Sequence, residues 1–153
     1  MKKTEQFLRE HWHATRRIGR LMMDLSLARS AYLECCKGLE SFGGVQTVRT
    51  KKKERRSPVE HSAIILVDQH RAELESIEKR LRQARATAAA VEYVVMNAGL
   101  DVREKEYIRL RYFENRAAES VAQRMFCSTA TCRRIRGRAI EKIEAACART
   151  NGE

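Results

Sequence analysis

Apolar residues recur along the first hundred positions at the spacing of paired helices. In the first run, steps of four and three residues alternate through Phe7, His11, Ala14, Ile18, Leu21, Leu25, Ala28, Tyr32, Cys35 and Leu39. In the second run, the same steps lead through Val67, His70, Leu74, Ile77, Leu81, Ala84, Ala88, Val91, Val95 and Ala98. Such alternation is typical of coiled-coil helices. It predicts one long helix over residues 1–40 and a second over residues 58–99.

The segment between these helices has the composition of a basic linker. A helix stop, SFGG, begins it at residue 41, and the run KKKERR follows at residues 51–56. The sequence SPVE at residues 57–60 then combines a capping box with a proline at the first helical position. Because the two seams have similar lengths, the economical arrangement is an antiparallel hairpin around a flexible linker at residues 41–57. Self-association of the seams is the alternative.

From residue 100 the periodicity changes to that of three short helices. Asp101 and Glu104 have the spacing of a capping box, and Ser128 is a suitable N-cap for the last helix. The helices are expected at about 102–113, 116–126 and 129–148. A small residue followed by spaced apolar residues, as in a helix-turn-helix, occurs at Val121, Ala122, Met125, Ser128, Cys132 and Ile135. We therefore expect an all-α fold, a long antiparallel hairpin followed by a tri-helical domain at residues 100–153.

The last helix has two chemically different faces. Its apolar stripe consists of Cys132, Ile135, Ala139, Ile143 and Ala146. On the other side, the side chains suited to contact base edges are Thr129, Ala130, Arg133 and Arg134. The expected phosphate-binding residues are Arg124, Ser128, Arg136 and Arg138, together with Lys51, Lys52, Lys53, Arg55 and Arg56 of the linker. The competing interpretation of these arginines is an ordinary solvated helix face.

Charge strengthens the expectation of an anionic partner. The 153 residues carry a formal net charge of +11, divided as +8 over residues 1–57, −1 over 58–99 and +4 over 100–153. A positive field at the two ends with a neutral middle favours nucleic acid over a uniformly solubilised surface. A membrane surface is the other class of partner that this charge allows.

Several classes of protein are disfavoured by the sequence. The apolar runs are shorter than the roughly 18 residues that a membrane span needs, and charges stand where a signal peptide would be apolar, so a cytoplasmic location is expected. The five cysteines lack a C-x-x-C pair, which favours free thiols without a metal or other cofactor. The carboxylates Glu104 and Glu106 are expected on different faces of a solvated helix. Without a catalytic constellation, an enzyme is not expected.

The segment LDVREKEYIRLRYFENRAAESVAQRMFCSTATCRRIRGRAIEKIEAA resembles region 4 of sigma-70-type factors. With its long helical first part, the whole chain resembles ArpU/RinA-type phage late transcriptional regulators. The resemblance implies a recognition helix at Thr129–Arg138 that enters the major groove. Two departures are Phe126, at a turn position where such motifs often have glycine, and Gly137 inside the recognition helix; Phe126 either distorts the turn or fills a pocket.

The leading hypothesis is a sequence-specific DNA-binding regulator, an activator of phage-type late genes. Its expected partners are double-stranded DNA, RNA polymerase and a second copy bound through residues 5–40 and 58–98. One alternative is a DNA-packaging component similar to phage terminase small subunits, which would form a ring of many copies. The other is a helical interaction protein that does not bind DNA, whose basic linker binds RNA or anionic lipid.

Overall fold

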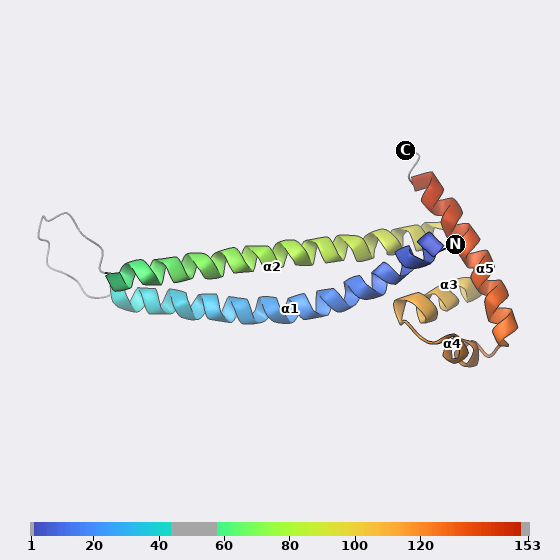
Figure 1. Cartoon of the computed structure of the whole chain (residues 1–153), viewed down its shortest axis with the longest axis horizontal. Helices are drawn as coiled ribbons and strands as arrows, with labels where there is room; N and C mark the ends of the chain where they lie inside the picture. Colours follow the sequence, from blue (N-terminus) through green and yellow to red (C-terminus); the bar gives the residue numbers. More distant parts are fainter. Residues whose placement is uncertain (1, 44–57, 151–153) are drawn as a thin grey trace, which may run out of the picture. The chain divides into compact units, whose positions relative to one another are not determined.

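The computed structural model describes residues 2–43 and 58–150, and every regular element in these ranges is a helix. The elements are α1 (Lys2–Gly43), α2 (Pro58–Asn97), α3 (Val102–Ile108), the short π-helix η1 (Arg109–Phe113), α4 (Ala118–Arg124) and α5 (Thr129–Thr150) (Figure 1). The expected all-α fold is confirmed. The basic residues of the linker and the proposed cap at Ser57 lie outside the described residues.

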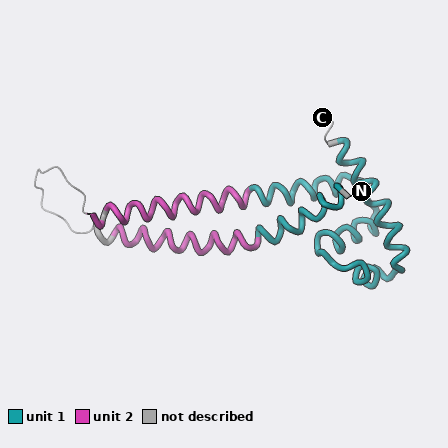
Figure 2. Tube along the Cα trace, viewed as in Figure 1, with its two compact units in different colours: residues 1–18, 83–153 teal, residues 19–82 magenta. Residues whose placement is uncertain are grey.

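The two long helices pack against each other through the seams that the sequence predicted. All twenty seam positions are buried or half-buried. The chain divides into two compact units, residues 19–82 and residues 1–18 with 83–153 (Figure 2). In the first unit, Arg29 bonds Glu78 at 3.1 Å and Tyr32 accepts a hydrogen bond from Arg71 at 3.3 Å. Partners on α2 move backwards as α1 advances, so the helices are antiparallel.

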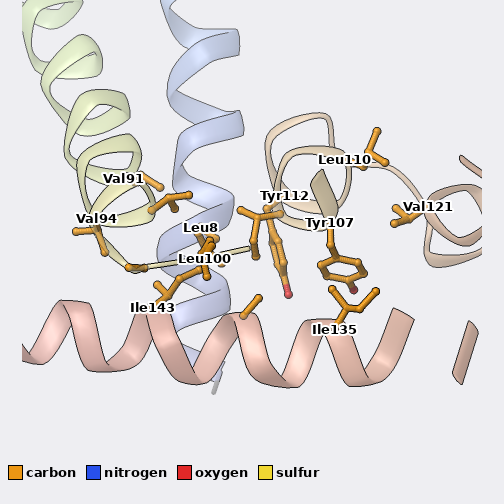
Figure 3. Packing of buried hydrophobic residues seen from close by; sticks show 14 of the residues in the cluster. Leu8, Val91, Val94, Leu100, Tyr107, Leu110, Tyr112, Val121, Ile135 and Ile143 are labelled. Carbon is orange, nitrogen blue, oxygen red and sulfur yellow. The ribbon is translucent and has the colours of Figure 1, made fainter. Parts of the chain in front are cut away.

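The second unit joins the beginning of α1 and the end of α2 to the three-helix segment in one core. Figure 3 shows the cluster, in which Leu8 of α1 and Val91 of α2 lie among apolar side chains of the later helices. Leu8, Val91, Ile108 and Ile143 are fully buried. His11 of α1 is also buried and stacks on Phe113 of η1, with ring centroids 3.8 Å apart. The core of this unit therefore depends on residues that precede the helix-turn-helix by about ninety positions or more.

Two local signals in the sequence have the expected geometry, and a glycine ends the second long helix. Asp101 accepts a hydrogen bond from the Glu104 amide at 2.7 Å, and Glu104 accepts one from the Asp101 amide at 2.9 Å, so the capping box is confirmed. Ser128 Oγ accepts a bond from the Thr131 amide at 3.1 Å, which makes Ser128 the cap of α5. Gly99 has φ +64° just after α2, a conformation that glycine adopts at little cost.

Phe126 adopts the backbone conformation that a glycine would favour at the turn. Its φ is +50° and its side chain is 96% exposed. The idea that this ring fills a pocket is therefore wrong. The turn is instead held by backbone bonds from the amides of Phe126 and Cys127 to the carbonyls of Gln123 and Ala122.

We expect Phe126→Gly to stabilise the protein by about 0.5 to 1 kcal/mol. Relief of the left-handed backbone gains roughly 1 to 2 kcal/mol, and the greater freedom of glycine in the unfolded chain offsets part of it. The measurement is urea denaturation of the full chain. Phe126→Ala removes the same ring but keeps Cβ, so it should give no such gain; an equal gain in both variants would contradict a backbone origin.

Candidate nucleic-acid interface

Helix α5 has an apolar stripe on its inner side and polar residues on its outer side. The stripe predicted from the sequence is confirmed, because each of its side chains is 5% exposed or less: Cys132, Ile135, Ala139, Ile143 and Ala146. Burial raises the pKa of the Cys132 thiol to about 11, with a smaller contribution from the Cys127 sulfur 3.3 Å away. Cys132 is thus a protonated packing residue, and the stripe fixes which side of α5 faces outward.

The four side chains suited to base contacts all lie on the outer side. Thr129, Ala130, Arg133 and Arg134, hereafter the reading face, are each exposed. At about 100° per residue they span an arc of about 140° on the first two turns of α5. Among the described residues, neither Arg133 nor Arg134 has an ion-pair partner. Both guanidinium groups are therefore available to an external acceptor.

The flanking residues expected to bind phosphate differ in their surroundings. Arg124 is exposed, and Ser128 is exposed although its hydroxyl caps α5. Arg138 is largely exposed and lies 3.8 Å from the Glu104 carboxylate. Arg136 is half-buried in an ion pair with Glu5 of α1. Three of these four residues are thus exposed, whereas Arg136 already has a partner within the protein.

A buried carboxylate of α3, Glu104, bonds a lysine of α5. Glu104 is 1% exposed, so the expectation that it lies on a solvated helix face is wrong. Its Oε2 accepts a bond from Lys142 Nζ at 2.7 Å, in addition to its place in the capping box. Glu106, by contrast, is half-buried, and its pKa is lowered by hydrogen bonds from Arg109. The sequence signal for Glu104 is the capping box itself, whose N3 residue can face inward.

The described residues offer neither a metal site nor a membrane span. No group of three or more His, Cys, Asp or Glu side chains there is arranged to hold a metal ion. None of the described helices has an apolar stretch long enough to cross a bilayer.

The three-helix segment is similar to a known protein family. Residues 98–145 match the model described as Sigma-70, region 4. This segment is a sigma-70 region 4-like helix-turn-helix. The match covers less than half of the chain and leaves out all of α1 and α2. Comparisons with curated proteins and with solved structures gave no match. A DNA-binding role is therefore supported for the region 4-like segment.

Gly137 lies at the centre of the outer face, one turn beyond Arg133. A Cβ built on it meets nothing within 4 Å, so we expect Gly137→Ala to stabilise the helix by up to about 1 kcal/mol. We also expect weaker DNA binding, because the added methyl stands where DNA would approach. Thermal denaturation and duplex titration of the full chain test both. Higher stability with unchanged affinity would instead mean that Gly137 is tolerated in the helix but has no role in DNA binding.

Proposed function

We propose that this protein is a sequence-specific regulator of transcription that reads the major groove of DNA with α5. The observation that carries the proposal is the exposed reading face at the start of α5, within the region 4-like segment. In a helix-turn-helix, the amino-terminal turns of the second helix contact base edges. The amino-terminal turns of α5 carry two exposed arginines, Arg133 and Arg134, which have no ion-pair partner among the described residues.

The side chains of the reading face suit direct contacts with bases. An arginine can bond O6 and N7 of guanine at once, and the methyl groups of threonine and alanine can contact the thymine methyl. Arg133 and Arg134 are thus proposed to select guanines, while Thr129 and Ala130 are proposed to contact thymine methyl groups.

Phosphate contacts are proposed for residues around this face. Arg124, Ser128 and Arg138 are exposed and therefore accessible to phosphate. Linker residues Lys51, Lys52, Lys53, Arg55 and Arg56 are proposed to add contacts that do not depend on sequence. Such contacts fix the position of the protein on the duplex, whereas base contacts select the site.

The biological setting is proposed as activation of phage-type late genes, with RNA polymerase as a partner. A second copy is proposed to double the DNA contacts by occupying two half-sites. The seams are used within the chain, so the outer side of the hairpin must supply the dimer contact. In residues 19–82 that side exposes Met22, Met23, Leu27 and Leu33. Sedimentation of the free protein tests this part, since a dimer has twice the mass of the chain.

The deciding experiment is selection of bound sequences from a random duplex pool. At about 150 mM salt, phosphate binding that is independent of sequence is suppressed. We expect a defined motif to be enriched by the wild-type chain. Folded protein that enriches no motif would contradict the proposal, and a ring of many copies in sedimentation would favour a packaging role.

A further inference from the structure

A polar groove runs along one side of the reading face, between the first turns of α1 and the start of α5. Its volume is about 370 Å³. Its charged side chains are those of Glu5, Arg9, Arg111, Glu119, Arg133 and Arg136. Two of these, Glu5 and Arg9, belong to α1 and lie far outside the region 4-like segment.

The charge of the groove is positive where it is not already balanced. Four arginines and two glutamates line it. Glu5 is paired with Arg136, and its side chain is only 17% exposed. Arg111 donates to the Arg116 carbonyl at 2.6 Å. Arg9 and Arg133 are exposed and have no ion-pair partner among the described residues, and neither does the exposed Glu119. The net charge of the lining side chains stays positive, so the groove suits an anion.

The position of the groove indicates which anion it would receive. Thr129 and Arg133 belong both to the reading face and to the groove wall. A helix seated in the major groove, which is about 12 Å wide, has a sugar-phosphate backbone on either side. DNA bound to the reading face would therefore bring phosphates next to Arg133 and toward the first turns of α1.

We propose that a backbone phosphate of bound DNA occupies this groove and that Arg9 contacts it. The inference rests on the proposed function and extends the interface beyond the region 4-like segment. Helix α1 would then have two roles, because Leu8 completes the core of the unit while the next residue, Arg9, contacts DNA. The Glu5–Arg136 ion pair fixes α1 beside α5 and positions Arg9 for this contact.

The test compares Arg9→Gln with Arg17→Gln in the full chain. Both changes remove one positive charge from α1, and Arg17 is exposed in a different depression, lined also by Glu10 and His13. For duplexes titrated at several salt concentrations, Arg9→Gln should lower the slope of log K against log salt by about 1. Arg17→Gln should leave the slope near the wild-type value, and Arg9→Lys should largely preserve it. Equal slopes for Arg9→Gln and Arg17→Gln would overturn the proposal.

Two further measurements separate the possible failures. If the wild-type chain binds DNA and Arg133→Ala relaxes its specificity, an unchanged slope for Arg9→Gln rejects only this inference. If the wild-type chain does not bind DNA, the proposed function itself fails. Thermal denaturation with inorganic phosphate, against chloride at equal ionic strength, measures whether free phosphate gives a stabilisation that depends on Arg9. Such stabilisation without an effect on DNA binding would assign the groove to free phosphate and overturn the proposal.

Discussion

The double variant Arg133→Ala/Arg134→Ala is expected to lose selectivity for the preferred DNA site while it remains folded. A bidentate contact between arginine and guanine is worth roughly 1 to 3 kcal/mol of discrimination, which corresponds to about 5- to 150-fold in affinity. Both side chains are exposed and without partners among the described residues, so their removal should not change the free energy of unfolding appreciably. The measurement is the ratio of affinities for the selected site and for random duplex.

A matched control is available on the same helix. Arg149 is exposed near the far end of α5, so Arg149→Ala removes the same charge away from the reading face. It should weaken selected and random DNA slightly and to the same extent. If single variants at Arg133 and Arg149 lose equal affinity on both kinds of DNA, the arginines of the reading face act only through charge, and the assignment of base contacts is wrong.

Glu104→Ala is expected to destabilise the protein by about 2 to 4 kcal/mol. The change removes one half of the capping box, worth about 1 kcal/mol, and a charge-assisted bond from Lys142, worth roughly 1.5 to 3 kcal/mol. It also leaves a space where a fully buried side chain stood. Because Lys142 is 40% exposed, water can solvate its ammonium group in the variant, which keeps the loss within this range. Urea denaturation measures the effect.

The neighbouring carboxylate supplies the control for this prediction. Glu106 pairs with Arg109 at the surface of α3, with a side chain 41% exposed. Glu106→Ala should therefore cost at most about 1 kcal/mol, as is usual for exposed ion pairs. Similar losses in the two variants would mean that burial of Glu104 contributes little to the stability of the domain.

Periodicity and capping signals were sufficient to predict the helices, because both depend on residues a few positions apart. The seams predicted paired helices but left open whether α1 pairs with α2 of the same chain, and Asp101 and Ser128 marked where α3 and α5 begin. The same local reasoning placed Thr129, Ala130, Arg133 and Arg134 on an exposed face. How these residues act on DNA remains a prediction.

Two features that the sequence patterns did not predict lie where the three-helix segment packs against α1. Leu8 stands next to the seam position Phe7, yet it is the more deeply buried of the two because the three-helix segment packs on this end of α1. Glu5 meets Arg136 across 131 positions of sequence. The spacing of a seam predicts which residues pack against one neighbouring helix. It does not predict which residues another helix will bury.

The burial of Leu8 beside residues of α5 also constrains the order of folding. Leu8 and Ile143 belong to one cluster, although 135 positions separate them in the sequence. During synthesis α1 emerges first, and its apolar end lacks these partners until nearly the whole chain has been made. The packing of Leu8 on α5 is a non-local contact, which forms more slowly than local helical turns. The amino-terminal turns of α1 are therefore expected to complete their packing last, and Leu8 stays without its partners on α5 until that helix has been made.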